Sequence, residues 1–294
     1  MNTNPWEAEA EWLRQQPNLK QLMIDCYMDE DIVAAAERFS KSEEFAEVRR
    51  WAVRCGLPQG GRILDVGAGK GISAYAWAVA GYKVVALEPN PGSTAGAGAI
   101  HRLSNQTGVP IEICLEHGER TGLMGDSFDL VYCREVLHHA ANMNQMCSEA
   151  FRVLHPGGIM IATREHVIDG PEQLPQFLQQ HPTHWLTGTE MAYSLSEYQR
   201  ALVQAGFKIL RTYGPMDTIV NYYPKSINEQ ALRSAQARLS CVVGSLVGRT
   251  ALWQAFWRAW QSHKASSPGR LYSFVAVKPP GTSSGENKIS FQKM

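Results

Sequence analysis

The residues best suited to hold a ligand are three alternating glycines that follow an acid. Asp65 ends an apolar run, and Gly67, Gly69 and Gly71 come directly after it. Glycine lacks a Cβ and adopts positive φ readily, so the backbone here can turn sharply and approach a ligand closely. About twenty residues later a second apolar run ends at Glu88, whose carboxylate can accept hydrogen bonds from a ribose diol. The spacing predicts a strand, a turn, a helix and a second strand that cradle a nucleotide-like cofactor.

Charge separates two classes of cofactor that this loop could bind. Dinucleotide-binding folds place a G-x-G-x-x-G turn around a pyrophosphate, whereas this chain has G-x-G-x-G with Asp65 two residues before the first glycine. A carboxylate there repels a pyrophosphate and attracts an ammonium group. S-adenosylmethionine carries an α-amino group and a sulfonium but no phosphate. The loop therefore favours S-adenosylmethionine over NAD.

Three later segments extend this pattern in a fixed order. They are Asp126 to Cys133 (DSFDLVYC), Glu135 to His139 (EVLHH) and Phe151 to Gly158 (FRVLHPGG). With the glycine loop, they resemble the class I S-adenosylmethionine-dependent methyltransferases, in the small-molecule branch related to methyltransferase type 11. The resemblance covers about residues 40–165. It implies an α/β fold, with a Rossmann-like, mainly parallel seven-stranded sheet that has helices on both faces.

Hydrophobic periodicity independently predicts the elements that carry these residues. Strands are expected at 61–66, 83–88, 109–115, 128–133, 158–164, 206–213 and 271–277, and helices between them at 71–80, 93–105, 141–154 and 196–205. Alternation of this kind is typical of a parallel sheet. We expect an N-terminal helical cap at 1–55, a methyltransferase domain at 56–280 with insertions at about 165–195 and 214–269, and a disordered tail at 281–294.

The resemblance also implies which residues hold the cofactor. It places Asp65 and Gly67 near the methionine amino group, Gly69 and Gly71 beside the sugar, and Glu88 on the ribose hydroxyls. The full implied set is Asp65, Gly67, Ala68, Gly69, Gly71, Glu88, Pro89, His117, Gly118, Glu119, Cys133 and Arg134.

Two parts of this set leave alternatives open. Glu116-His117-Gly118-Glu119 stands where the family usually has Gly-Asp, so either glutamate could accept from the adenine amino group, with His117 stacking or donating. Arg134 could pair with the methionine carboxylate or form an ordinary salt bridge.

Methyl transfer depends mainly on positioning, because the sulfonium methyl is already electrophilic. An oxygen or nitrogen nucleophile must also lose a proton, and histidine is the natural base near neutral pH. The candidate bases are His138, His139, His166 and His184, and the candidate substrate ligands are Glu135, Glu165, Trp185, Glu190 and Tyr193. The alternative for each is a solvated loop residue.

The second insertion contains an amphipathic helix whose aromatic residues recur at helical spacing: Trp253, Phe256, Trp257 and Trp260. The favoured interpretation is a lid helix that buries this stripe against its own domain. A dimer surface is one alternative. Another is peripheral membrane contact, in which basic residues such as Arg258 would face lipid phosphates.

Composition narrows the class of partner. The chain has 294 residues, 44% of them apolar, and a formal net charge of zero, which disfavours nucleic acid. Residues 1–48 hold eleven acids and four bases, while residues 199–270 hold ten bases and two acids, which is compatible with an anionic substrate or with solvated faces. No leader pattern or membrane-spanning run is present, so we expect a cytoplasmic protein, monomeric or homodimeric.

The six cysteines lack C-x-x-C spacing, so we expect no metal site. The sequence as a whole predicts a methyltransferase that uses S-adenosylmethionine on a small molecule or glycoconjugate precursor. Oxygen is the favoured acceptor atom, with carbon and nitrogen as open alternatives, and the aromatic and basic residues of the second insertion are compatible with a sugar- or phosphate-bearing acceptor. Two rivals remain. One is a binding protein that keeps the fold and the cofactor pocket without catalysis. The other is an RNA methyltransferase, which the basic region of residues 199–270 would favour.

Overall fold

The structure is a computed structural model that describes every residue except 1–4, 182–183, 185–187, 189, 265–266 and 281–294. The tail expected at 281–294 and the candidate ligand Trp185 therefore lie outside the described residues. Within the described part of the chain, no helix combines the length and apolar character needed to cross a bilayer.

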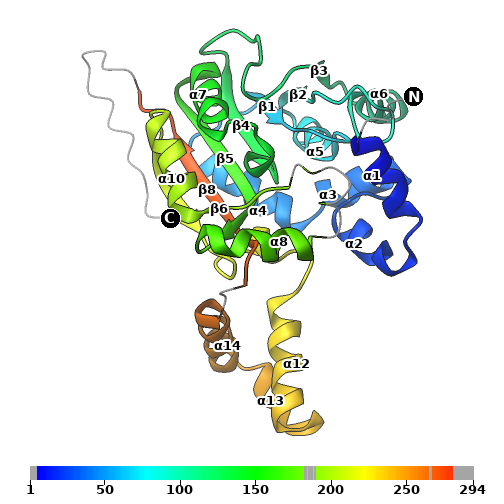
Figure 1. Cartoon of the computed structure of the whole chain (residues 1–294), viewed down its shortest axis with the longest axis vertical. Coiled ribbons are helices and arrows are strands. Elements are labelled where there is room, and N and C mark those ends of the chain that lie inside the picture. Colours follow the sequence, from blue (N-terminus) through cyan, green and yellow to red (C-terminus); the bar gives the residue numbers. More distant parts are fainter. Residues whose placement is uncertain (1–4, 182–183, 185–187, 189, 265–266, 281–294) are drawn as a thin grey trace.

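One mixed sheet forms the centre of the molecule (Figure 1). Its main path has the order β3, β2, β1, β4, β5, β8, β7, and the first five of these strands are mutually parallel. The bounds are β1 Arg62–Val66, β2 Lys83–Leu87, β3 Glu112–Cys114, β4 Phe128–Arg134, β5 Leu154–Ile168, β7 Lys208–Tyr213 and β8 Arg270–Val277. β8 runs antiparallel to both of its neighbours. The predicted Rossmann-like, mainly parallel sheet is confirmed, with the two-residue β6 (Tyr193–Ser194) added beside the end of β5.

Alternate side chains of the strands face two separate helical layers. Leu64 and Val66 of β1 face the core that includes α7 (Met143–Val153) and α10 (Leu195–Gln204). Ile63 faces the opposite core, which includes α4 (Glu43–Arg54) and α5 (Ile72–Val79). Asp65 shares the face of Ile63, so its carboxylate lies toward α5, the helix that follows the glycine loop.

The N-terminal region is helical and is called the cap below. It consists of α1 (Pro5–Arg14), η1 (Pro17–Leu19), α2 (Lys20–Asp25), α3 (Ile32–Ser40) and α4. The side chains of Asp31 and Ser42 accept hydrogen bonds from the free N–H groups at the starts of α3 and α4. The cap also contacts the glycine loop, because Lys70 Nζ donates to the carbonyl oxygen of Asp29 at 2.5 Å.

A second contact joins the cap to the loop that precedes α6 (Ala97–Thr107). The carboxylate of Glu7 in α1 accepts from the backbone N–H groups of Thr94 and Ala95 at 3.0 and 2.9 Å. Burial alone would raise the pKa of Glu7, but these donors hold it below its ordinary value. The cap is therefore attached to two loops that begin at the carboxyl ends of β1 and β2.

Both insertions are helical. The first contains η3 (Pro171–Gln173) and α8 (Leu174–Gln180) and leads to β6. The second contains α11 (Ile219–Tyr222), α12 (Ile227–Leu239), α13 (Cys241–Gly248) and α14 (Ala251–Lys264). In Figure 1, α12, α13 and α14 project from the body as a separate hairpin. Trp257 of α14 is 3% exposed and packs on Ile227 and Ala231 of α12, with Trp253 and Trp260 partly buried beside it. Phe256 is 54% exposed, so only part of the aromatic stripe is buried, and it is buried within the hairpin itself.

Candidate functional site

The glycine loop adopts the geometry that its sequence predicts. Gly67, Gly69 and Gly71 have φ of +63°, +54° and +81°, the region that favours glycine. A Cβ on Gly67 would lie 2.7 Å from Cγ2 of Val136, so the backbone there packs directly on the segment after β4. A Cβ on Gly69 would meet no described atom within 4 Å. Gly69 therefore faces space into which a ligand could fit.

Glu88 lies beside this space at the carboxyl end of β2. Its Oε2 accepts from the N–H of Gly69 at 2.7 Å, and its Oε1 accepts from the N–H of Asn90 at 2.9 Å. Burial raises the pKa of Glu88 to about 7. Each carboxylate oxygen has a further lone pair, so Glu88 can hold the loop and accept from a diol at the same time.

Asp65 lies beneath the loop. Its side chain is 1% exposed and accepts from Ser73 Oγ at 2.5 Å, which ties β1 to the first turn of α5. Burial raises the pKa of Asp65 to about 7. This contact gives Asp65 a role in fixing the loop, and its expected position near a methionine amino group stays a prediction.

The segment after β3 lies at the same edge of the sheet. Gly118 packs against Met146 of α7 and Val66 of β1, where a Cβ would come within 2.6 Å of Met146 Cε. Glu119 accepts from the N–H of Asn142 at 3.3 Å, while His117 is exposed. Glu116 and Pro89 are also exposed. Among the described residues, the contacts of these side chains do not distinguish Glu116 from Glu119 as the residue that would accept from the adenine amino group.

Arg134, at the end of β4, forms an internal ion pair. Its Nε donates to Oε1 of Glu44 at 2.7 Å, and its guanidinium lies over the rings of Tyr27 and Phe39. The structure thus contains the salt bridge that was one of the two alternatives for Arg134. The neighbouring Cys133 is 1% exposed and belongs to the core beside α7.

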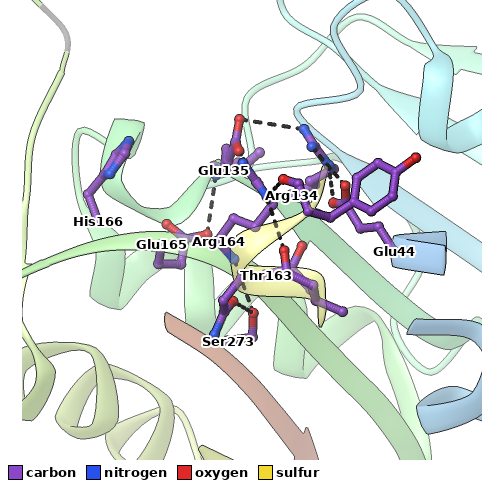
Figure 2. A network of polar contacts seen from close by, with 12 residues as sticks. Glu44, Arg134, Glu135, Thr163, Arg164, Glu165, His166 and Ser273 are labelled. Carbon is purple, nitrogen blue, oxygen red and sulfur yellow. Dashed lines mark hydrogen bonds and ion pairs between the residues drawn. The ribbon is translucent and has the colours of Figure 1, made fainter. Parts of the chain in front are cut away.

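Two residues with left-handed backbone conformations meet next to this pair (Figure 2). Glu135 and Arg164 have φ of +58° and +61°, and Arg164 Nε donates to Glu135 Oε1 at 2.5 Å. Nη1 of Arg164 donates to the carbonyl oxygens of Val220 and Tyr223, both at 3.0 Å. Burial alone would raise the pKa of Glu135, but the two arginines hold it well below its usual range. Glu135 is therefore a permanent anion at this edge.

Glu165 organises the segment that follows β4. It is fully buried and accepts from the backbone N–H groups of Val136, Leu137 and His138 at 3.1 to 3.2 Å. It also contacts Nδ1 of His138 at 2.7 Å. Burial raises the pKa of Glu165 to about 7, while these donors favour its charged form. Glu165, expected as a substrate ligand, is thus a positioning residue for η2 (Leu137–His139).

The histidines of this region lie together. His166 follows Glu165 in β5, and its Nδ1 lies 3.2 Å from the carbonyl oxygen of Gly269. Its ring centroid is 4.6 Å from that of His138 and 5.6 Å from that of His181. Burial lowers the pKa of all three histidines to about 4, so they are neutral near pH 7.

The structure brings most predicted catalytic and substrate residues to this edge. Glu190 is 5% exposed and lies beside His138, His139 and His181. Tyr193 lines a neighbouring hollow of about 290 Å³ with Asn142 and Arg200. The Nδ1 atom of His184 is buried without a hydrogen-bond partner among the described residues.

His181 is the member of this group that the sequence-based candidate set omits. Its only sequence signal is its place in the histidine-rich stretch from His181 to Tyr193.

Comparison with known proteins agrees with this geometry. Residues 64–162 match the family model of the methyltransferase domain, which spans the glycine loop, Glu88 and the start of β5. The ubiquinone biosynthesis O-methyltransferase of Agrobacterium fabrum is 28% identical over 160 residues, covering 53% of this chain. The chain spans 63% of the length of that relative.

Solved structures share the fold at lower identity. The cyclase SpnF has a TM-score of 0.53 at 20% identity, with 81% of each chain covered. Phosphoethanolamine N-methyltransferase 2 of Haemonchus contortus, solved with phosphomonomethylethanolamine and S-adenosylhomocysteine, has a TM-score of 0.56 at 19% identity. That match covers 81% of this chain and 52% of the other. At these identities the likeness shows the fold alone, and the cyclase demonstrates that the fold accommodates more than one reaction.

Proposed function

We propose that this chain, which has the fold of the class I S-adenosylmethionine-dependent methyltransferases and carries a methyltransferase domain at residues 64–162, transfers a methyl group from S-adenosylmethionine to a small-molecule acceptor. The observation that carries the proposal is that a candidate cofactor pocket and a histidine-bearing segment lie at the same edge of the sheet. The open space at Gly69 and the carboxylate of Glu88 suit an adenosyl ligand, and the His138 segment lies at the end of the adjacent strand.

The cofactor fits the residues present on two counts. Glu88 keeps lone pairs for ribose hydroxyls, and Gly69 leaves the loop open for close approach. When bound, S-adenosylmethionine supplies an electrophilic methyl group. The protein's part is to orient the acceptor in line with that methyl group and to exclude water.

We further propose that the acceptor atom is oxygen. A hydroxyl group must lose its proton as it attacks, and the buried histidines are neutral and able to accept one. When Glu165 is ionised, its contact with His138 Nδ1 places the ring proton on Nδ1 and leaves Nε2 as a free base. The O-methyltransferase relative supports this choice. The hollow beside Tyr193 is lined by Arg200 and Glu197 together, so its polar groups favour a hydroxyl-rich acceptor.

Calorimetric titration of the purified chain with S-adenosylmethionine, S-adenosylhomocysteine and NAD tests the proposal. We expect both adenosyl ligands to bind and NAD not to bind. Glu88→Ala should weaken adenosyl binding by tenfold or more, as expected for the loss of a charged acceptor worth about 1.5–3 kcal/mol. Glu112→Ala is the matched control, because Glu112 is an exposed acid at the opposite end of the neighbouring strand. Equal affinities in the two variants would refute the cofactor site.

Acceptor chemistry is tested next with methyl-labelled S-adenosylmethionine and a panel of hydroxylated, sugar and phosphate-bearing small molecules. A labelled methyl ether in the product supports an oxygen acceptor, whereas an N-methyl or C-methyl product contradicts it. Cofactor binding without transfer to any acceptor would favour the non-catalytic binding protein. Methyl transfer to RNA, but to none of these small molecules, would favour the RNA methyltransferase.

A further inference from the structure

Four histidines and one glutamate from separate parts of the chain converge at the edge of the sheet. His138 and His139 come from η2, His166 from the end of β5, His181 from the residue after α8, and Glu190 from the segment before β6. Two groups of three residues each bring one ligand atom per residue to within 4.8 Å of one another. The groups are His138, His139 and Glu190, and His166, His181 and Glu190. These five residues are called the His–Glu190 cluster below.

We propose that the His–Glu190 cluster is a binding site for a divalent transition-metal ion, with Zn²⁺ as its simplest occupant. Imidazole and carboxylate ligands hold Zn²⁺ at about 2.0–2.2 Å, so two ligands in tetrahedral geometry are about 3.3 Å apart. The Nε2 atom of His181 lies 3.6 Å from Glu190 Oε2. The Nε2 atoms of His138 and His139 lie 3.9 Å from Oε2 and Oε1 of Glu190. Shifts of about half an ångström would bring these three nitrogens to ligand spacing from Glu190.

These three contacts to Glu190 are longer than direct hydrogen bonds, in which nitrogen and oxygen atoms lie about 2.7–3.2 Å apart. His181 Nδ1 is buried without a hydrogen-bond partner in the described part of the chain. Several basic nitrogens thus surround a carboxylate at the spacing of ligands around a shared cation.

Contacts on the far sides of two rings provide an independent argument. Histidines that bind a metal typically donate their other ring N–H to a carboxylate or a backbone carbonyl oxygen. Nδ1 of His138 contacts Glu165 at 2.7 Å, and Nδ1 of His166 contacts the carbonyl oxygen of Gly269 at 3.2 Å. The carbonyl oxygen of Gly269 always accepts and Glu165 accepts when it is ionised, so with Glu165 charged both rings carry the proton on Nδ1. The unprotonated Nε2 atoms, the form that binds metal, are left for the cluster.

The ligand types indicate the class of metal. Four imidazoles with one carboxylate suit Zn²⁺, Fe²⁺, Mn²⁺, Co²⁺ or Ni²⁺, whereas Mg²⁺ and Ca²⁺ prefer sites made of oxygen. This inference departs from the expectation of no metal site, which considered only cysteine spacing. If the proposed function also holds, the ion lies at the acceptor's edge of the sheet and occupies Nε2 of His138. An open coordination position would then lower the pKa of a bound acceptor hydroxyl, in place of a histidine base.

Metal binding can be measured without cofactor or acceptor. The full chain is stripped with a chelator, dialysed, and titrated with Zn²⁺ in competition with a chromophoric chelator, and separately with Co²⁺ and Mg²⁺. We expect one equivalent of Zn²⁺ per chain, visible absorption bands from bound Co²⁺, and no comparable affinity for Mg²⁺. Absence of a stoichiometric Zn²⁺ site would overturn the inference, whatever the result with S-adenosylmethionine.

Variants then locate the site. Glu190→Gln should weaken Zn²⁺ binding by at least tenfold, because the ligand shared by both groups of three is lost. His139→Ala is the second variant, chosen because His139 is 23% exposed and its truncation should disturb folding little. We expect it to weaken Zn²⁺ binding by the same factor. His155→Ala is the matched control, since His155 is exposed and lies outside the cluster. Zn²⁺ affinity that is unchanged in folded His139→Ala and Glu190→Gln, or equally reduced in His155→Ala, would place the metal elsewhere.

Discussion

At the scale of single residues, Glu88 links the local fold to ligand binding. Its carboxylate holds the N–H groups of Gly69 and Asn90, and burial raises its pKa to about 7. Ribose hydroxyls donate to a carboxylate more strongly than to a neutral acid. The protonation of this one side chain should therefore control affinity for the ribose.

The first prediction concerns the pH dependence of ribose binding. The ligand is 5′-methylthioadenosine, which has the ribose and adenine but no amino group that titrates in this range. The charged fraction of Glu88 rises about tenfold between about pH 6 and pH 8, so affinity should increase by that factor as pH rises. Calorimetry over this range measures it. Glu88→Gln should bind more weakly and with a flat profile. A persistent slope in Glu88→Gln would assign the titration to another group, such as Asp65.

The second prediction separates two glycines of the loop. Gly67→Ala forces an alanine into positive φ against Val136 at 2.7 Å, whereas Gly69→Ala has the same backbone problem but open space. We expect Gly67→Ala to lower the free energy of unfolding by about 1–3 kcal/mol and by more than Gly69→Ala. Gly69→Ala should mainly weaken cofactor binding. Denaturant unfolding and calorimetry provide the two readouts.

Val136→Ala supplies the control for the steric argument. If the clash with Val136 is the cause, then Gly67→Ala combined with Val136→Ala should be less destabilised than the sum of the two single variants. Additive losses would contradict the clash.

At the scale of elements, the N-terminal cap is attached by a buried charge pair. Glu44 of α4 is fully buried and receives hydrogen bonds from Nε and Nη2 of Arg134, at the end of β4, at 2.7 and 3.3 Å. The pair joins the cap to the strand that leads into the His138 segment (Figure 2). This pair adds to the Lys70 and Glu7 contacts that attach the cap to the loops of the candidate site.

The third prediction follows from this pair. Glu44→Ala leaves Arg134 without its main partner, which should lower the free energy of unfolding by about 3–5 kcal/mol. Glu37→Ala, which breaks the exposed i,i+4 pair with Lys41, should change it by less than about 0.5 kcal/mol. Chemical denaturation measures both. Combining Glu44→Ala with Arg134→Met should recover part of the lost free energy of unfolding. No recovery would show that the unpaired charge of Arg134 is not the cause of the loss.

Element positions were predictable to within a few residues because they depend on local patterns. β5 is the main exception. The segment 158–164 was expected, but the strand spans Leu154–Ile168. The reason is pairing on both sides: Leu154 is in register with Phe128 of β4, and Val167 with Arg270 of β8. Neighbouring strands extend the ladder through Gly157, whose φ is +85°. A single segment does not carry that information.

At the scale of the whole molecule, the hairpin α12–α14 projects from the body (Figure 1). It also exposes apolar side chains. Leu252 and Leu246 are 85% and 72% exposed, whereas Trp257 is buried against α12. The hairpin thus has its own small core. The lid helix, the dimer surface and the membrane contact all remain hypotheses for its outer face.

The fourth prediction is that the hairpin is dispensable for cofactor binding. A variant in which a Gly/Ser linker replaces residues 228–264 should bind S-adenosylmethionine with an affinity within about twofold of the full chain, since the loop and Glu88 are held by β1, β2 and α5. Calorimetry tests this, and a loss beyond tenfold would contradict it. Once an acceptor is known, a raised KM in the same variant would support the lid, and unaltered acceptor kinetics would exclude it.

The sequence by itself determined the sheet, the glycine turn and the position of Glu88. The strands of the sheet follow from hydrophobic periodicity along the chain, whereas the glycine turn and the position of Glu88 are encoded locally by residues 61–88. The tertiary structure alone decided which distant side chains meet. Glu44 pairs with Arg134, and Glu165 turns inward to hold η2. His181 joins Glu190 and the other histidines because loop paths and rotamers, set by long-range packing, bring their ring nitrogens together.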